Sequence, residues 1–388
     1  MRRWGWALLV VLLLGCRGAQ PEEIATLRIA VIAPFSGDYA ALGNSVRNAV
    51  VMAAETWNER GGVAGLRIEL VLEDSQCDYL QGRTAAQAAL GEGAAFVIGA
   101  VCATASEGVA QVVSGASVSG DGTLDGGGLL GGGNAALGAL QITPASVDSG
   151  LTLDPDGAVR PQVFRVPLTD EAQGIVAARY AREQFGAARA AILYDGNSSY
   201  GATLAASFSA AFAAIGGEVV ATGTYDAGAL VFYEELEAVR DETPDLVYLP
   251  GYAALANTLV SQARSFGVLV PVMGSDGWHS SALDLAVVEG AAFTTHFYGD
   301  EPSSRLRDWM ARYEGRYLAE PDALAVLSYD AADLLFTAIA ETEVADPFLV
   351  ARTLESLTYD GLSGTMSFDA NHDPVKSMVV LRVEGGQV

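Results

Sequence analysis

The sequence predicts an α/β protein made of two units, each built around a parallel β-sheet. Apolar segments that end at glycine or polar residues alternate with amphipathic helical segments, which is typical of a parallel sheet covered on both faces. This alternation occurs in two successive series, and the 388 residues exceed the usual size of a single hydrophobic core. A composition of 51% hydrophobic and 18% charged residues excludes a disordered chain and a coiled coil.

The elements follow one another in a regular order. The first series is expected to contain strand Leu27–Ala33, helix Val46–Arg60, strand Leu66–Asp74, helix Thr84–Glu92 and strand Ala94–Val101. The second series contains the strands QVFRV, ARAAILYD, EVVATGTY, LVYLPGY and VPVMGSD, separated by four helical segments. Further helices are expected between Ser304 and Ser356, and GTMSFDANHDP with SMVVLRVEG is expected to form a hairpin.

The N-terminal residues have the features of an export signal. Arg2 and Arg3 precede eight apolar residues at 7–14, a run too short to span a bilayer. The string LLGC resembles the lipobox of bacterial lipoproteins, in which the cysteine becomes acylated. We therefore expect a signal peptide at 1–15, a lipid on Cys16 and a tether at 16–26. The alternative is an ordinary secretory signal with a cysteine near its cleavage site.

The three cysteines are an odd number for an exported protein, and lipidation of Cys16 would explain this. Cys77 and Cys102 then remain as one pair in an oxidising compartment, where a disulfide is expected and two free thiols are the alternative. A zinc site is disfavoured because none of the three histidines lies at ligand spacing from a cysteine.

Several classes of function are excluded by what the sequence contains. Its 22 basic and 47 acidic residues give a net charge of −25, which is unsuited to binding nucleic acid. No GxxxxGK[ST], HExxH or GxSxG motif is present. The string GGGLLG matches a dinucleotide fingerprint, but no strand precedes it, so no cofactor is expected. It lies in the glycine-rich stretch at about 115–138, which we expect to be a mobile insertion or a degraded helix.

Small or hydroxyl-bearing residues follow the ends of six predicted strands. These segments are FSG at 35–37, CATAS at 102–106, TPAS at 143–146, YDGNSSYG at 194–201, PGY at 250–252 and GSDGW at 274–278. In parallel sheets, ligands bind beyond the carboxyl ends of the strands, where helix N-termini present free N–H groups. We therefore expect a cleft between two lobes that suits a small zwitterion, with hydroxyls and amides for its carboxylate and an acid for its ammonium group.

Taken together, these motifs resemble a known family. The run RIAVIAPFSGDYAALGNSVRNAVVMAAETWNERGGVAG is followed in order by LEDSQCD, VIGAVCATAS, ITPAS, YDGNSSYG, LVYLPGY, QARSFG, MGSDGW, YEGRY, SYDAADLL and SFDANHDP. This order is similar to that of the type I periplasmic binding proteins of ABC importers, and especially to their leucine/isoleucine/valine-binding branch. The resemblance covers residues 27 to about 385.

The resemblance implies two Rossmann-like lobes with parallel sheets, joined by three crossovers. Lobe one would comprise 27–165 plus 298–360, and lobe two 166–297 plus 361–388. The resemblance also identifies Cys77 and Cys102 as the disulfide of that branch.

Ligand-binding roles follow from the same resemblance. Asp276 would hold the α-ammonium group of the ligand, while Tyr200 and Tyr252 would face the ligand from lobe two. The alternatives are a plain turn at the acid and surface positions for the two aromatic residues. Trp278 would wall the site or, alternatively, pack within a lobe.

On the side of lobe one, Ala145 would offer its backbone to the α-carboxylate, and Leu42 and Leu324 would wall the side-chain pocket. Ala103 and Val147 stand where the branch has a serine and a threonine that bond this carboxylate. Each lost bond would cost roughly 1.5 to 3 kcal/mol.

Thr104 and Ser146, next to these two positions, would supply the missing hydroxyls if each loop shifts by one residue. The alternative is that they only cap helices.

The expected function is that of an exported, lipid-anchored, monomeric solute-binding protein of the periplasm or cell envelope. It would pass a small amino acid of the branched-chain type, or a related amide, to the permease subunits of an ABC importer. The alternatives are a ligand-sensing module for a receptor and a homologue with lost or altered binding. An enzyme is disfavoured because no nucleophile and base pair or metal set is visible in the sequence.

Overall fold

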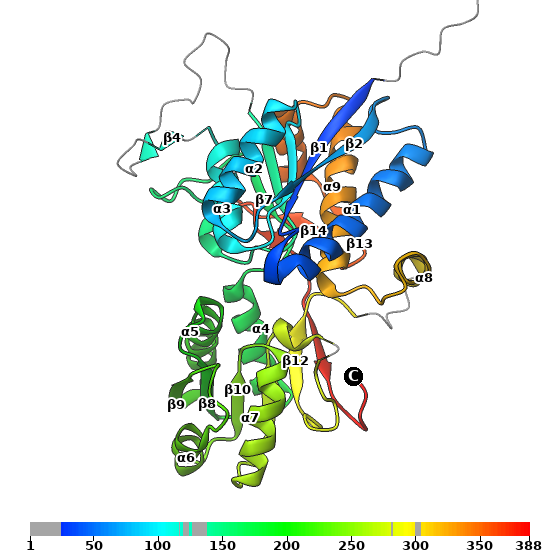
Figure 1. The fold of residues 1–388 in the computed structure, drawn as a ribbon. Coiled ribbons are helices and arrows are strands. Elements are labelled where there is room, and N and C mark those ends of the chain that lie inside the picture. The colour runs from blue at the N-terminus through cyan, green and yellow to red at the C-terminus, as the bar shows by residue number, and fades with distance from the viewer. Residues whose placement is uncertain (1–24, 116, 119–123, 126–137, 281, 299–303) are drawn as a thin grey trace, which may run out of the picture.

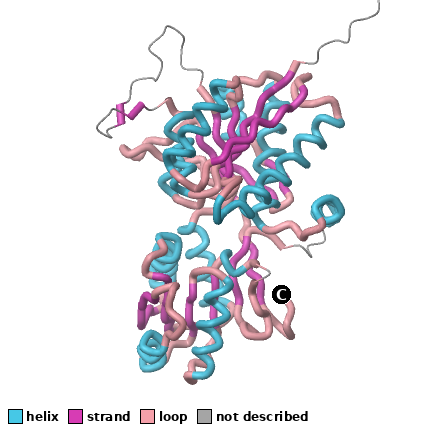
Figure 2. Tube along the Cα trace, in the orientation of Figure 1, coloured by secondary structure: helices cyan, strands magenta, loops and turns pink. Residues whose placement is uncertain are grey.

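The computed structural model describes residues 25–388, apart from 116, 119–123, 126–137, 281 and 299–303. The chain forms two lobes, one above the other in Figure 1, and each lobe has its own sheet with helices packed against it. Figure 2 shows the strands of each sheet lying between helices. The predicted α/β class with two lobes and parallel sheets is confirmed.

The sheet of the first lobe has the order β2-β1-β3-β6-β7, and all its neighbouring strands are parallel. The strands are β1 (Thr26–Ala33), β2 (Arg67–Asp74), β3 (Phe96–Gly99), β6 (Leu140–Thr143) and β7 (Val163–Arg165). Ile29 and Val31 of β1 enter one core cluster while Ala30 and Ile32 enter another, on the opposite face. This alternation buries both faces of the sheet, as a parallel sheet requires.

Six longer helices belong to the first lobe. They are α1 (Ala40–Glu59), α2 (Tyr79–Gly91), α3 (Ala103–Val113), α8 (Ser304–Tyr317), α9 (Ala323–Thr342) and α10 (Pro347–Ser356). Helix α1 begins six residues before the predicted position of residue 46 because Gly43 allows it to pass Pro34 closely. A Cβ atom on Gly43 would lie 2.0 Å from the carbonyl oxygen of Pro34.

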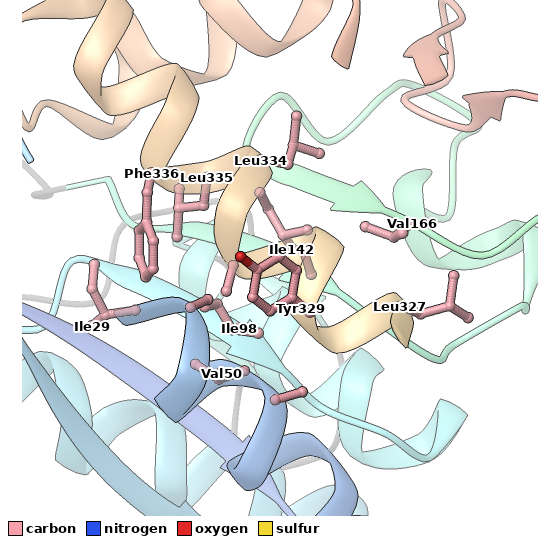
Figure 3. Close-up of a cluster of buried hydrophobic side chains, with 14 of the residues drawn as sticks. Ile29, Val50, Ile98, Ile142, Val166, Leu327, Tyr329, Leu334, Leu335 and Phe336 are labelled. Atoms are coloured by element: carbon pink, nitrogen blue, oxygen red, sulfur yellow. The ribbon is translucent and has the colours of Figure 1, made fainter. Parts of the chain in front are cut away.

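Helix α9 is the central helix of the larger core in this lobe. Its side chains Leu334, Leu335 and Phe336 pack with Val50 of α1 and Ile98 of β3 (Figure 3). Within the described part of the chain, only α9 is long and apolar enough to cross a membrane, but 78% of its most apolar window is buried inside the lobe. It therefore serves as a core helix.

The sheet of the second lobe has the order β16-β12-β11-β10-β8-β9, and only β12 and β16 are antiparallel. Its strands are β8 (Arg189–Asp195), β9 (Glu218–Tyr225), β10 (Leu246–Leu249), β11 (Val272–Gly274), β12 (Ala292–Thr295) and β16 (Val379–Arg382). Its helices are α4 (Asp170–Glu183), α5 (Ser199–Ala214), α6 (Tyr233–Asp241) and α7 (Ala253–Ser265).

The chain passes between the lobes three times: after β7, after β12 and before β16. A small antiparallel sheet of β13 (Tyr359–Gly361), β14 (Gly364–Phe368) and β15 (Pro374–Val375) precedes the last passage. Met366 and Phe368 of β14 pack in the core of the first lobe. The expected boundary at residue 361 is therefore wrong, and the last crossover lies between β15 and β16.

The predicted hairpin of GTMSFDANHDP and SMVVLRVEG is also wrong. Strand β14 pairs with β13 and β15, whereas β16 pairs with β12 in the other lobe. Three short 3-10 helices, η1 (Gly37–Tyr39), η2 (Ser149–Thr152) and η3 (Asp276–Trp278), follow strands or loops at the sheet ends. Most of the glycine-rich stretch lies outside the described residues, which include only the short strands β4 (Ser117–Val118) and β5 (Leu124–Asp125) within it.

Candidate functional site

The candidate site lies at the carboxyl ends of the two sheets, on the side where the lobes are connected. The chain leaves the first sheet at the carboxyl end of β7 and the second sheet at the carboxyl end of β12. Because the strands next to them are parallel, the carboxyl ends of β3 and β6 lie at the same edge as that of β7, and those of β8, β10 and β11 at the same edge as that of β12. The loops at these ends therefore lie where the lobes meet.

Asp276 is at the centre of the second-lobe part of the site. It begins η3, directly after β11 and Ser275, and its side chain is 21% exposed. Tyr200, in the first turn of α5, donates its hydroxyl hydrogen to Oδ1 of Asp276. Nε2 of His296, the residue directly after β12, lies 3.1 Å from Oδ2. The carboxylate of Asp276 is thus contacted by Tyr200, which follows β8, and by His296, which follows β12.

These contacts set the charge of Asp276. Burial raises the pKa of this carboxyl group, but the hydrogen bonds from His296 and Tyr200 outweigh burial and bring the pKa below its usual value. The hydroxyl oxygen of Tyr200 is itself held in place, 2.8 Å from Oγ of Ser275 and 3.2 Å from the amide nitrogen of Gly277. Asp276 is therefore a fixed, ionised acid at neutral pH.

Tyr252 completes an aromatic wall beside this acid. It precedes α7 at the end of β10, its side chain is 61% exposed, and its ring stacks on that of Tyr200 at a centroid distance of 5.4 Å. The structure thus brings together Asp276, Tyr200 and Tyr252, as the sequence predicts. The exposed ring of Tyr252 and the half-buried ring of Tyr200 give the site a flat apolar surface beside the negative charge of Asp276.

A second acid lies close to the first and was not predicted. Asp170, in the first turn of α4, is 5% exposed, and its Oδ1 has no hydrogen-bond partner among the described residues. Burial, followed by repulsion from Asp276, raises the pKa of Asp170 to about 8. Asp170 is therefore protonated at neutral pH, and this acid pair carries a single negative charge.

His296 was also missed by the sequence analysis. It is a lone histidine that follows an ordinary buried strand, and only its place in the fold, beside β11, brings it to Asp276. The one available signal was the general tendency of ligand sites to use residues at strand ends.

The first-lobe side of the site consists of two loops at adjacent strand ends. Ala103 and Thr104 begin α3 and are exposed, and the Thr104 hydroxyl donates to the carbonyl of Cys77 at 3.1 Å. Cys77 and Cys102 form the predicted disulfide, with their Cα atoms 5.2 Å apart. The disulfide and the threonine together tie the start of α3 to the loop after β2.

In the second loop, the Thr143 hydroxyl accepts from the amides of Ser146 at 3.1 Å and Ala145 at 3.4 Å. The Ser146 side chain is 2% exposed, and its hydroxyl has no partner among the described residues. The Ser146 hydroxyl is therefore buried and without a partner among the described residues, whereas that of Thr104 is already engaged.

The remaining predicted residues lie on both lobes. Leu42, in the first turn of α1, is 36% exposed, and Leu324, in the first turn of α9, is half-buried. Trp278 is 1% exposed and packs in the second-lobe core near Phe293, with ring centroids 6.3 Å apart. The prediction that Trp278 walls the ligand is therefore wrong, because its ring turns inward over β11.

The two lobes influence each other electrostatically at this edge. Burial and then His296 lower the pKa of His279, whereas Asp276 and Asp322 oppose this lowering. Asp322 belongs to the first lobe, where it caps the N-terminus of α9 by accepting from the amide of Ala325 at 2.7 Å. Within the described residues, no group of three histidine, cysteine or acidic side chains is arranged to hold a metal ion.

The sequence has relatives that bind solutes. Residues 26–387 match the model of the periplasmic binding protein family. The leucine-, isoleucine-, valine-, threonine- and alanine-binding protein of Pseudomonas aeruginosa is 25% identical over 355 residues, which cover 90% of this chain and 87% of that protein.

Solved structures of such proteins have the same fold. A leucine binding protein from Thermotoga maritima is 28% identical with a TM-score of 0.73, over 93% of this chain and 96% of that one. A substrate-binding protein of an ABC transporter from Desulfitobacterium hafniense, in complex with Leu, is 26% identical with a TM-score of 0.74, over 93% and 98% of the two chains. This chain belongs to the periplasmic binding protein family, as a type I member of its leucine/isoleucine/valine-binding branch.

Proposed function

We propose that this protein binds a small amino acid of the branched-chain type, or a closely related amide, between its lobes and delivers it to the permease of an ABC importer. The observation that carries this proposal is the half-buried carboxylate of Asp276, which Tyr200 and His296 contact at the carboxyl ends of the second-lobe strands. Its negative charge matches the ammonium group of an amino acid, and the stacked rings of Tyr200 and Tyr252 suit an apolar side chain.

The other end of the ligand would meet the first lobe. The Ser146 hydroxyl and the backbone at Ala145 would bond the α-carboxylate, with Ala103 and Thr104 at the adjoining helix start. Leu42 and Leu324 would contact the ligand side chain. The names of the relatives support this class of ligand, and the missing hydroxyls at Ala103 and Val147 predict weaker binding than a complete set of hydroxyls would give.

We further infer that the protein acts outside the cytoplasm as a monomer held by a lipid on Cys16. This cysteine and the preceding signal lie outside the described residues, so the inference rests on the sequence LLGC and on the relatives, which are periplasmic binding proteins. Metabolic labelling with a palmitate analogue tests it, because Cys16→Ser should abolish labelling of the expressed chain while leaving the export signal in place.

Titration calorimetry with leucine, isoleucine, valine, threonine, alanine and leucinamide tests the proposed ligand class. Asp276→Ala should weaken binding of any ligand with an ammonium group by roughly 30-fold or more, since a buried charge pair that loses one partner costs about 2 to 5 kcal/mol. Glu234→Ala, an exposed acid in the first turn of α6 of the same lobe, is the matched control and should bind normally. Equal affinity in the two variants would remove Asp276 from the site.

A further inference from the structure

A pocket outside the candidate site has the chemistry of an anion-binding site. Its volume is about 340 Å³, and it lies in the first lobe where α1, α8, α9 and β13 meet. Figure 1 shows these elements on the same side of that lobe. Its lining includes three guanidinium groups and several aromatic rings, among them Arg60, Arg305, Arg312, Trp309 and Tyr329.

The one carboxylate that lines this pocket, Asp333, already has a full set of partners. Its Oδ1 accepts from the indole nitrogen of Trp57 at 2.7 Å. Its Oδ2 accepts from Arg305 at 2.8 Å and from the Tyr359 hydroxyl at 2.7 Å. Asp333 is 8% exposed, and its charge is neutralised by that of Arg305. None of these hydrogen bonds involves the other two arginines.

Arg60 and Arg312 have no acidic partner and no side-chain hydrogen bond among the described residues. Arg60 caps the C-terminus of α1, Arg312 lies on α8, and both are exposed. Two cations in one pocket without an acidic partner in the described part of the chain are unexpected at a net charge of −25, because acidic residues outnumber basic ones. The pocket is thus locally positive on an acidic protein.

The three arginines line the same pocket as the phenol of Tyr329. Burial and Asp333 raise the pKa of Tyr329, while Arg305, Arg312 and Arg60 all oppose this rise. One anion bound in this pocket would therefore lie in the field of all three guanidinium groups. Guanidinium groups also bind carboxylates in a planar, two-bond geometry.

A buried donor without an acceptor is a second, independent observation. Trp309 lines the pocket and is 1% exposed, yet its Nε1–H has no partner among the described residues. A buried N–H without an acceptor destabilises the fold, and a bound acceptor would remove this cost. The ring of Trp309 packs against that of Tyr329, with centroids 5.4 Å apart, so the wall beside this donor is aromatic.

From this arrangement we propose that the pocket binds a small organic carboxylate with a flat apolar body. Arg60 and Arg312 bond the carboxylate, and Trp309 and Tyr329 pack against the apolar part. The aromatic wall favours such a ligand over inorganic phosphate, which has no apolar surface to bury. This site is separate from the proposed amino-acid site and does not depend on that proposal.

Benzoate is the probe for this pocket, titrated into the purified protein by calorimetry at fixed ionic strength. We expect measurable binding that falls at least tenfold in the double variant R60Q/R312Q, since each lost bond to a charged group accounts for about that factor or more. The matched control is R67Q/R307Q, which removes the same charge from exposed arginines of β2 and α8 that do not line the pocket. It should bind benzoate like the unaltered chain.

Two further ligands and one further variant make the test specific. Benzamide, which has the same shape without the charge, and inorganic phosphate, which has charge without the ring, should both bind more weakly than benzoate. Asp276→Ala should leave the arginine-dependent benzoate binding unchanged, which distinguishes this pocket from the amino-acid site. Benzoate affinity that is equal in R60Q/R312Q and R67Q/R307Q would overturn the proposal, as would absence of benzoate binding at millimolar concentration or tighter binding of phosphate or benzamide.

Discussion

Replacing Asp170 with asparagine should stabilise the protein at neutral pH and leave its ligand affinity unchanged. Asp170→Asn keeps the size of the side chain but cannot ionise. In the folded chain the pKa of Asp170 is raised from 3.8 to about 8, so between these values the folded state holds a proton that the unfolded state has released. Rising pH in this interval therefore favours unfolding of the unaltered protein.

The size of the effect follows from this difference in pKa. At pH 7 the unfolded chain is about three pH units above its own pKa, and each unit corresponds to about 1.4 kcal/mol. The free energy of unfolding of Asp170→Asn should thus exceed that of the unaltered chain by at most about 4 kcal/mol at pH 7, which corresponds to a rise in Tm of about 8 to 16 °C for a lobe of this size. Near pH 4, close to the unfolded-state pKa of 3.8, the difference should shrink to well under about 1 kcal/mol, because a large share of the unfolded chains then holds the proton as well.

Scanning calorimetry at pH 4 and pH 7 measures this, with Asp156→Asn in an exposed turn as the control. Leucine titration at pH 7 should give the same affinity for Asp170→Asn as for the unaltered chain, because the protonated acid contributes no charge. A loss of stability at pH 7, or a large loss of leucine affinity, would refute the conclusion that this pair of acids carries one charge.

Three other changes test separate features. Tyr200→Phe removes the hydroxyl that holds Asp276 and should weaken leucine binding about tenfold by calorimetry; unchanged affinity would contradict the role of that hydrogen bond. The double variant C77A/C102A should lose roughly 3 kcal/mol of stability in the chain-entropy model, and a reductant should lower the Tm of the unaltered chain but not that of the variant. Lys376, the sole lysine in the sequence, is half-buried and donates to the hydroxyl of Ser363 at 2.9 Å, so amine-reactive esters should modify it more slowly in the native chain than in urea; modification of the native chain at the rate of the unfolded chain would contradict this protection.

The strands and the two lobes could be predicted because a strand that is buried on both faces has a recognisable pattern of apolar residues. Strands such as β1 and β3 are continuous apolar runs, and they were predicted within a few residues of their observed ends. The sequence of a strand does not show which other strand it pairs with. Strand β16 is as apolar as a hairpin strand would be, but its partner β12 is distant in the sequence, and only the assembled sheet reveals the pairing.

The candidate site was predictable in part for a similar reason. Asp276 and Tyr200 lie within recognisable motifs at strand ends, whereas Asp170 and His296 are single residues without a motif. Their relevance depends on the fold, which brings the start of α4 and the end of β12 to Asp276. The inward orientation of the Trp278 ring also depends on packing. The sequence around this residue does not show whether the ring faces the core or the site.

The late position of β16 has a consequence for biosynthesis. This strand completes the edge of the second sheet, yet α8, α9 and α10 of the other lobe all lie between it and its partner β12. A chain that folds from its N-terminus therefore has an open sheet edge beside β12 until its last strand is added. An exposed edge is a site of mispairing, so aggregation during folding should begin at β12, and a chaperone that covers this strand would prevent it.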